Sequence, residues 1–425
     1  MDQKYSAWSD FDSKLEAAMP ALYGPEAMPR QRERYRALLR GAEEIFGDSK
    51  EIAIFSAPGR TEIGGNHTDH QHGKVLAGSI GLDIIAAVVP NGENVVRLKS
   101  EGFPMDEVDL GDLEVHPEEY NKSVSILRGT AAWFARQGCR LEGFNAYTRS
   151  DVFKGSGLSS SAALEVLLGN IFNSLFNGNK CTPVEIAQIG QFAENVYFGK
   201  PSGLLDQMAS SVGGLVAIDF ADNDSPVVEK VDFDFASAGH ALCIIDSGAD
   251  HADLTDEYAA VTSELKKICA HFGKSVLREV PGAELFAALP ELRKECGDRA
   301  VLRALHVHDE NYRVDRQVAA LRRGDFAHFL SEITESGLSS WRYLQNVIPA
   351  GYTAHQDVAF ALGLAEHLLD TAGACRVHGG GFAGTVQAFV PVDMLDGFKS
   401  GIERVLGEGS CHVLAIRPVG GVRLV

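Results

Sequence analysis

The chain has 425 residues, of which 45% are hydrophobic and 23% charged, as in ordinary globular proteins of about two or three domains. The formal net charge of −19 argues against a nucleic-acid backbone or an anionic membrane as the principal partner. The N-terminus lacks a signal-peptide profile, no apolar run reaches membrane-spanning length, and the seven cysteines never form Cys-x-x-Cys. These features predict a cytoplasmic protein with reduced thiols.

Apolar periodicity and turn residues predict a mixture of helices and strands along the chain. A short helical stretch around 11–22 precedes helices at 31–46, 124–137, 160–176, one that ends near 198, and others at 255–272, 313–338 and 356–372. Strands are expected at 52–56, 75–89, 95–98, 145–150, 215–220 and 241–246, with a final hairpin of 375–378 and 385–390. Because strands and helices do not alternate strictly, the pattern predicts the α+β class.

A run of small residues, Gly155-Ser-Gly-Leu-Ser-Ser-Ser-Ala-Ala163, leads directly into the helical pattern of 160–176. Glycines let the backbone approach a ligand closely, and the free N–H groups of a helix N-terminus favour phosphate. A serine helix cap is the alternative, but one serine would suffice for it. The run predicts a nucleotide-binding loop made of Gly155, Ser156, Gly157, Leu158, Ser159, Ser160 and Ser161.

A second cluster, Ala57-Pro-Gly-Arg-Thr-Glu-Ile-Gly-Gly-Asn-His-Thr-Asp69, follows the predicted strand 52–56. A turn at Pro-Gly would present the Arg60 guanidinium to phosphate, and His67 and Asp69 offer hydrogen-bond groups to a polyhydroxylated ligand. The alternatives are a surface salt bridge for Arg60 and a solvated turn for the rest. A zinc site is not favoured for the alternating histidines, because no further cysteine or histidine cluster flanks them.

Two further segments contain groups that could take part in chemistry. Glu194 lies in a helical pattern, and Asp206 follows a turn at Pro201-Ser-Gly203, so either carboxylate could coordinate magnesium or accept a proton. The alternative for Asp206 is a helix N-cap. Gly379–Gly384 has dinucleotide-motif spacing, but a strand pattern follows it, so we expect a tight hairpin packed against the nucleotide loop or the substrate.

Together these segments resemble one branch, the galactokinases, of the kinase superfamily named after galactokinase, homoserine kinase, mevalonate kinase and phosphomevalonate kinase. Ala57–Arg60 with Gly65–Asp69 is similar to the galactokinase signature, Gly155–Ala163 to the superfamily phosphate loop, and Gly379–Gly384 to its third motif. The resemblance covers about residues 31–425. It implies a two-lobed α+β fold with the active site between an N-terminal lobe (31–180, closed by a strand within 410–425) and a C-terminal lobe (181–409). Residues 1–30 form an extension.

The resemblance also implies a reaction, in which ATP and D-galactose give α-D-galactose 1-phosphate and ADP. Its implied residues are Asp206 and Arg60 for catalysis, Ser160 and Glu194 for Mg²⁺, the 155–161 loop for ATP, and Asn66, His67, Asp69, Gly203 and Tyr258 for the sugar. The implied partners are sugar and ATP alone, with no nucleic acid or membrane, and the implied state is a monomer or weak homo-oligomer.

The sequence departs from the family signature at one sugar-binding position, because Asn66 replaces the usual glutamate of Gly-Glu-His-Thr-Asp. An amide donates as well as accepts hydrogen bonds, so the preferred hydroxyl pattern could differ. N-acetylgalactosamine, L-arabinose and D-galacturonate are therefore alternative substrates. A non-catalytic sugar and ATP sensor is the alternative of a different class, although the intact loop Gly157–Ala162 argues against it.

Overall fold

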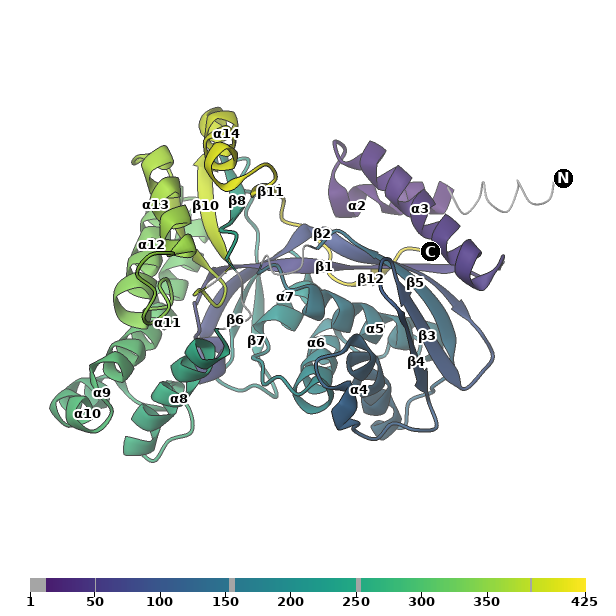
Figure 1. Ribbon diagram of the computed structural model, residues 1–425, viewed down its shortest axis with the longest axis horizontal. Helices are drawn as coiled ribbons and strands as arrows, with labels where there is room; N and C mark the ends of the chain where they lie inside the picture. Colours follow the sequence, from purple (N-terminus) through teal and green to yellow (C-terminus); the bar gives the residue numbers. More distant parts are fainter. Residues whose placement is uncertain (1–12, 50, 153–156, 250–253, 383) are drawn as a thin grey trace.

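The computed structural model describes residues 13–49, 51–152, 157–249, 254–382 and 384–425. Gly155 and Ser156 of the predicted nucleotide loop therefore lie outside the described residues. Helices and strands are mixed without regular alternation, which confirms the expected α+β class (Figure 1). Among the described helices, none combines the length and the apolar character needed to cross a membrane. All seven cysteines are free thiols.

An eight-stranded sheet forms the centre of the molecule, and the long strands β1 and β2 pair along most of their length. Its main path runs β12-β1-β2-β5-β3-β4, while β6 pairs with the start of β2 and β7 pairs with β6. The strands are β1 (Ala53–Gly64), β2 (Lys74–Pro90), β3 (Val95–Ser100), β4 (Met105–Asp109), β5 (Phe144–Ser150), β6 (Leu215–Asp219), β7 (Val227–Val231) and β12 (Val422–Arg423).

Both faces of this sheet are covered by helices. Ile54, Ile85 and Ala87 pack beneath α2 (Pro20–Tyr23) and α3 (Met28–Phe46), whereas Phe55 and Val88 face a second apolar core on the opposite side. That second core is built with α4 (Ser123–Arg136), α5 (Ser160–Phe176), α6 (Pro183–Phe192) and α7 (Leu205–Val212) (Figure 1). Covering on both faces explains why β1 is buried along its whole length and β2 along most of its length, including polar residues such as Ser56 and Asp83.

A second, four-stranded antiparallel sheet has the order β11-β8-β10-β9. Its strands are β8 (His240–Asp246), β9 (Ala374–His378), β10 (Thr385–Pro391) and β11 (Cys411–Leu414). It lies among helices α11 (Asp298–Arg322), α12 (Phe326–Ser339), α13 (Asp357–Leu369) and α14 (Leu395–Leu406), while α8 (Thr255–His271), α9 (Gly282–Ala287) and α10 (Leu289–Glu295) extend beyond it (Figure 1). The expected hairpin is therefore confirmed as β9 and β10, paired in register from Thr385 opposite His378.

The eight-stranded sheet also includes β6 and β7, which follow residue 180 in the chain, because β6 pairs with the start of β2. One expectation about organisation differs from the structure. The predicted helix over 313–338 is two helices, α11 and α12, separated at Gly324 and Asp325. Gly324 has a positive φ of 68°, and the Asp325 side chain accepts a hydrogen bond from the His328 N–H, which starts the new helix.

Candidate active site

Arg60 and Asp206, which are 146 positions apart, form a two-pronged ion pair. Arg60 Nε donates to Asp206 Oδ1 at 2.6 Å and Nη2 donates to Oδ2 at 2.7 Å. The Arg60 side chain is 9% exposed, whereas that of Asp206 is 35% exposed. The guanidinium is therefore buried, while the carboxylate remains partly exposed to solvent, as a group that contacts a substrate must be.

The local structure that positions Arg60 differs from the expected turn. Arg60 lies inside β1, where the pairing of β1 with β2 shifts register between Pro58 and Arg60. Such a bulge redirects a side chain without ending the strand. Arg60 N–H also donates to the Leu158 carbonyl oxygen at 3.0 Å, and its Nη1 donates to the Gly157 carbonyl oxygen. The arginine is thus joined directly to the predicted nucleotide loop.

Asp206 lies in the first turn of α7, whose N-cap is Leu204, so Asp206 is not the N-cap. Its Oδ2 accepts a second hydrogen bond, from Ser159 Oγ at 2.5 Å. Burial alone would raise the pKa of Asp206, but the charge of Arg60 and the hydrogen bonds from Arg60 and Ser159 hold this pKa below its ordinary value. The carboxylate is therefore ionised at neutral pH and is a weak base.

The described part of the predicted nucleotide loop enters α5 through two left-handed residues, Gly157 (φ 67°) and Ser159 (φ 59°). Ser159 occupies the N-cap position of α5, yet its side chain makes no cap hydrogen bond because Oγ reaches Asp206 instead. A non-glycine residue in this conformation carries strain. Ser159 therefore does not act as a simple side-chain cap, and the N–H groups of the first turn of α5 receive no cap hydrogen bond from it.

Glu194 lies in a π-helical turn, η3 (Ala193–Phe198), that continues α6. One carboxylate oxygen of Glu194 accepts from Lys200 Nζ at 3.2 Å and the other from Gln207 Nε2 at 2.9 Å. Gln207 Nε2 also donates to Glu165 Oε2 at 2.8 Å, and Glu165 is fully buried with Oε1 unpaired among the described residues. Burial and the charge of Glu194 raise the pKa of Glu165 well above its ordinary value.

Asp69 and Gly203, both expected to contact the sugar, are neighbours. A Cβ added to Gly203 would come within 1.8 Å of Asp69 Oδ2, so the Asp69 carboxylate occupies the space that a larger residue at 203 would need. The Asp69 carboxylate is fixed by a hydrogen bond from the His70 N–H to Oδ1 at 2.9 Å. The charge of Asp69 is one of those that raise the pKa of Arg60, and Gly203 precedes Asp206 by three residues.

His67 and Tyr258, also predicted for the sugar, meet at the turn between β9 and β10. His67 Nε2 lies 2.9 Å from the Gly380 carbonyl oxygen, and Tyr258 Oη donates to the Gly381 carbonyl oxygen at 2.7 Å. Burial lowers the pKa of His67 to about 4, although the Gly380 hydrogen bond opposes the shift. The ring is therefore neutral at pH 7; because Nε2 donates to a carbonyl, Nδ1 is an acceptor suited to a sugar hydroxyl.

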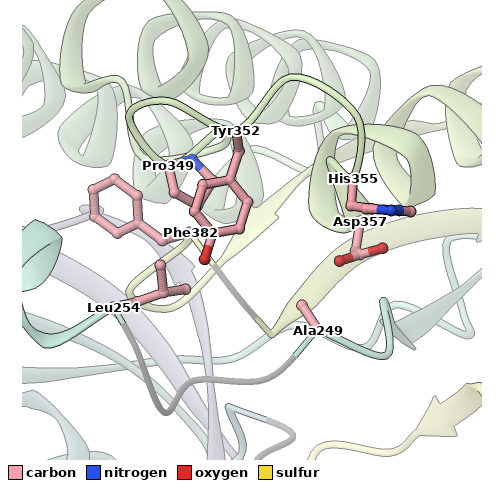
Figure 2. Close-up of a pocket in the computed structure, with 7 residues that line it drawn as sticks. All are labelled: Ala249, Leu254, Pro349, Tyr352, His355, Asp357 and Phe382. Carbon is pink, nitrogen blue, oxygen red and sulfur yellow. The ribbon is translucent and has the colours of Figure 1, made fainter.

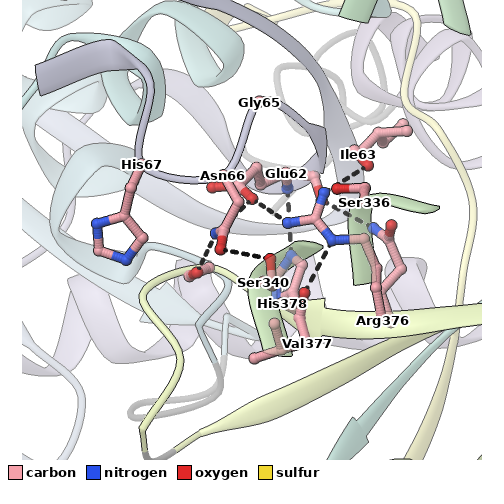
Figure 3. A network of polar contacts seen from close by, with 12 residues as sticks. Glu62, Ile63, Gly65, Asn66, His67, Ser336, Ser340, Arg376, Val377 and His378 are labelled. Atoms are coloured by element: carbon pink, nitrogen blue, oxygen red, sulfur yellow. Dashed lines mark hydrogen bonds and ion pairs between the residues drawn. The ribbon is translucent and has the colours of Figure 1, made fainter. Parts of the chain in front are cut away.

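Asn66 differs from the expectation that its amide contacts the sugar. It is fully buried, and its side chain makes four hydrogen bonds within the protein, with Glu62, Gly379, Ser340 and Asn346. In Figure 3 the Asn66 side chain points into this polar network, whereas the His67 ring lies outside it. The structure thus places Asn66 behind the candidate site and His67 at it, because the amide is already satisfied by its neighbours.

A cavity of about 160 Å³ is lined by Ala249, Leu254, Pro349, Tyr352, His355, Asp357 and Phe382 (Figure 2). Phe382 also packs edge-to-face against Tyr258, with ring centroids 5.3 Å apart. The Phe382 ring therefore separates the cavity from Tyr258, one of the candidate sugar residues. Its volume is below the 300–1,000 Å³ usual for ligand pockets. This cavity is therefore too small to hold a nucleotide.

Several residues of this site were missed by sequence reasoning. They are Lys200, Gln207 and Glu165 around Glu194, His378 and Thr385 beside Gly157, and Glu62 and Arg376 beside Asn66. A Cβ on Gly157 would lie 3.0 Å from Thr385 Oγ1 and 3.2 Å from His378 Nδ1, which confirms that the expected hairpin packs against the nucleotide loop. The available signals were that Lys200 and Gln207 flank the Pro201–Asp206 segment and that Glu62 lies within the Ala57–Asp69 segment.

Comparison with known proteins places this site in a family. A profile of the galactokinase galactose-binding signature matches residues 43–90, and one of the GHMP kinases N-terminal domain matches residues 125–214. The galactokinase of Streptomyces coelicolor is 32% identical over 361 residues, covering 85% of this chain and 90% of that protein. The galactokinase of Glaesserella parasuis is 30% identical, covering 84% and 90%.

Solved structures agree with these matches. A crystal structure of Lactococcus lactis galactokinase complexed with galactose aligns with a TM-score of 0.79 at 25% identity, covering 91% of this chain and 99% of that one. A mevalonate kinase structure aligns with a TM-score of 0.60 at 13% identity, which shows a shared fold. Because a galactokinase is 32% identical over most of both chains and both family profiles match, this chain belongs to the galactokinase family of GHMP kinases.

Proposed function

We propose that the protein transfers the γ-phosphoryl group of ATP to the anomeric hydroxyl of D-galactose, giving α-D-galactose 1-phosphate and ADP. The observation that carries this proposal is the Arg60–Asp206 ion pair, which is bonded to Ser159 at the start of α5. It joins a cation for phosphoryl oxygens to a carboxylate for a hydroxyl, at a helix N-terminus that favours phosphate. Family membership and a galactose-bound relative support the choice of sugar.

In the proposed mechanism Asp206 accepts a hydrogen bond from the anomeric hydroxyl and aims its oxygen at the γ-phosphorus. The new bond joins that oxygen to phosphorus, and the bond from phosphorus to the β–γ bridging oxygen breaks with its electron pair staying on ADP. The hydroxyl proton passes to an oxygen of the transferred phosphoryl group and from there to solvent. Because Arg60 keeps the pKa of Asp206 low, the carboxylate contributes mainly by orienting the hydroxyl. Arg60 stabilises the charge that spreads over the γ-phosphoryl oxygens.

We propose that the loop N–H groups and hydroxyls of residues 155–161 hold the phosphates of ATP, and that Ser160 and Glu194 hold Mg²⁺ with them. The donor set fits, because a hydroxyl and a carboxylate are oxygen ligands of the kind that Mg²⁺ prefers. Among the described residues no group of three histidine, cysteine or acidic side chains could hold a metal ion by itself. Such a site suits an ion that arrives with the nucleotide; when bound, it neutralises charge on the phosphate oxygens.

For the sugar we propose contacts from Asp69, His67 and Tyr258, with Gly203 leaving room for the Asp69 carboxylate. We infer that the site lies between two lobes, each built around one of the two sheets, and that β12 returns the C-terminal segment to the first. The proposed setting is the cytoplasm, with the protein a monomer or weak homo-oligomer and no nucleic-acid partner.

The test is to incubate the purified protein with ATP, Mg²⁺ and one sugar at a time, measure ADP release, and identify the product by ³¹P NMR. We expect α-D-galactose 1-phosphate from galactose, and lower kcat/KM for N-acetylgalactosamine, L-arabinose and D-galacturonate. Preference for one of these three would replace galactose as the substrate. Binding of ATP and galactose without turnover would favour the sensor alternative and overturn the proposal.

A further inference from the structure

We propose that Asn66 is a positioning residue whose amide is required by Glu62, and that it governs sugar binding by fixing the loop that holds His67 and Asp69. This inference rests on the proposed sugar kinase function and deepens it. Residue 66 occupies a sugar-binding position in the family resemblance, yet here its side chain is fully buried. The question is what the amide does in that place.

The hydrogen bonds of Asn66 use every strong donor and acceptor direction of the amide. Nδ2 donates to Glu62 Oε1 at 3.0 Å and to the Gly379 carbonyl oxygen at 2.6 Å. Oδ1 accepts from Ser340 Oγ at 3.1 Å and from Asn346 Nδ2 at 2.9 Å. A primary amide has two N–H donors and two lone pairs, so none remains for a sugar hydroxyl.

These bonds join three separate parts of the molecule to the loop. Gly379 starts the turn between β9 and β10, Ser340 lies in the π-helical turn η5 (Ser340–Leu344), and Asn346 follows it. The backbone of Asn66 is also held, because its carbonyl oxygen lies 3.0 Å from His306 Nε2. Any change at position 66 therefore moves the loop relative to the turn.

The same turn carries the groups that meet the sugar residues. Its Gly380 carbonyl oxygen binds His67 Nε2, and its Gly381 carbonyl oxygen accepts from Tyr258 Oη. Asn66 thus binds one residue of the turn while the adjacent His67 binds the next one. The spacing between His67 and Tyr258, and with it the fit of the sugar, depends on this double attachment.

An amide is required at position 66 because the neighbouring Glu62 carboxylate already forms an ion pair with one cation, Arg376. Glu62 Oε1 accepts from both Asn66 Nδ2 and Arg376 Nη2, the latter at 2.5 Å. The other two Arg376 nitrogens, Nη1 and Nε, donate to the carbonyl oxygens of Ile63 and Val377, each at 2.9 Å, and Arg376 is fully buried (Figure 3). A carboxylate at position 66 could donate to neither partner and would add a second buried negative charge beside Glu62.

The first test is the isosteric variant Asn66→Asp, which changes two N–H donors into an acceptor and leaves the shape unchanged. We expect kcat/KM for galactose to fall by about tenfold or more, as for a buried charge left unpaired, with the galactose KM rising more than the ATP KM. The double variant Glu62→Gln/Asn66→Asp restores one carboxylate, one amide and one arginine. When Glu62→Gln is the reference, adding Asn66→Asp should lower kcat/KM much less than Asn66→Asp lowers it in the wild-type protein.

A second test distinguishes positioning from direct contact. Wild type and Asn66→Asp are compared on galactose and on its 2-, 3-, 4- and 6-deoxy derivatives. A positioning role predicts the same fold-loss on every sugar; a loss that disappears on one deoxy sugar would identify the hydroxyl that Asn66 contacts and overturn the inference. Absence of recovery in the double variant would overturn the requirement for the amide.

A milder variant keeps the inference testable if Asn66→Asp does not fold. Ser340→Ala removes one donor to Asn66 Oδ1 and lies outside the 57–69 segment. We expect this variant to raise the KM for galactose and for each of the four deoxy sugars by the same factor. Its circular dichroism spectrum should be normal, and an unchanged KM would contradict the inference. Wild type that fails to phosphorylate galactose would instead overturn the proposed function, so the two failures are distinguishable.

Discussion

At the scale of single residues, the candidate site depends on pairs that neutralise each other and still leave one partner accessible. Arg60 is buried and fixed by the Gly157 carbonyl oxygen, whereas Asp206 is about one-third exposed. The ion pair therefore cannot swing away, and the carboxylate retains a free side for a hydroxyl. Such fixed orientation is the main source of rate enhancement available to a phosphoryl-transfer enzyme.

Asp206→Asn should abolish turnover while ATP binding persists. The amide keeps the size of the side chain but removes the charge that pairs with Arg60 and orients the hydroxyl, so we expect kcat to fall by about 10²–10⁴. Steady-state kinetics measures the loss, and calorimetric titration with ATP checks that the nucleotide site is intact. Turnover close to wild type would remove Asp206 from the mechanism.

Gly203→Ala should weaken sugar binding selectively. The added Cβ would meet Asp69 Oδ2 at 1.8 Å, so the carboxylate must move; we expect the galactose KM to rise about tenfold or more, on the order of one lost charged hydrogen bond, with the ATP KM nearly unchanged. The matched control is Gly363→Ala in α13, where a Cβ meets no atom within 4 Å. That control should leave both KM values as in wild type.

At the scale of elements, a buried charge cluster attaches α3 and the C-terminal segment to β2. Asp83 on β2 accepts from Arg34 of α3 and from Arg417 Nη1, the latter at 2.9 Å, and both Asp83 and Arg417 are fully buried. Arg34 Nη2 also donates to the Asp83 carbonyl oxygen at 2.7 Å. Removing one member of such a cluster leaves buried charge unpaired, which costs far more than the cluster contributes as a whole.

Asp83→Asn should therefore destabilise the protein by about 3–5 kcal/mol. Burial alone would raise the pKa of Asp83, but the charges of Arg34 and Arg417 hold it below its ordinary value. The stabilisation is thus complete above the unfolded-state pKa of about 3.9 and is lost as pH falls through the lower folded-state pKa. Urea unfolding between pH 3 and 7 measures both effects, and the variant should show a flatter acid dependence than wild type.

The sequence predicted best those elements whose determining residues lie within one short segment of the chain. Helix α5 begins at Ser160 and ends at Phe176 as predicted, because its apolar spacing and small-residue start lie within one segment. The break between α11 and α12 was missed although Gly324-Asp325 is a local signal, because the apolar pattern that ends at Leu321 resumes at Phe326. Arg60 was expected in a turn, since Pro-Gly normally ends a strand, yet pairing with β2 extends β1 to Gly64.

At the scale of the whole molecule, magnesium should be needed for activity, whereas the bound substrates should raise the stability of the fold. Because the proposed Mg²⁺ arrives with the nucleotide, EDTA should abolish phosphoryl transfer without changing the Tm of the ligand-free protein. Galactose with an ATP analogue and Mg²⁺ should raise the Tm. A ligand present at 100 times its Kd adds about 2.7 kcal/mol to the free energy of unfolding. Differential scanning fluorimetry measures both. A large drop in the ligand-free Tm with EDTA would instead indicate a structural metal.

The sequence by itself determined the fold class and the family, and it singled out the candidate nucleotide loop and Arg60, Glu194 and Asp206 as candidate residues, because each depends on short-range pattern or motif. Only the tertiary structure decided which residues meet. Glu62 and Arg376 are 314 positions apart, and no local periodicity relates them. The burial of Asn66 follows from the same fact, since its four partners come from β1, η5, the segment after η5 and the β9–β10 turn. Motif spacing specifies which side chains are available, whereas packing of distant elements decides which of them remain free for a ligand.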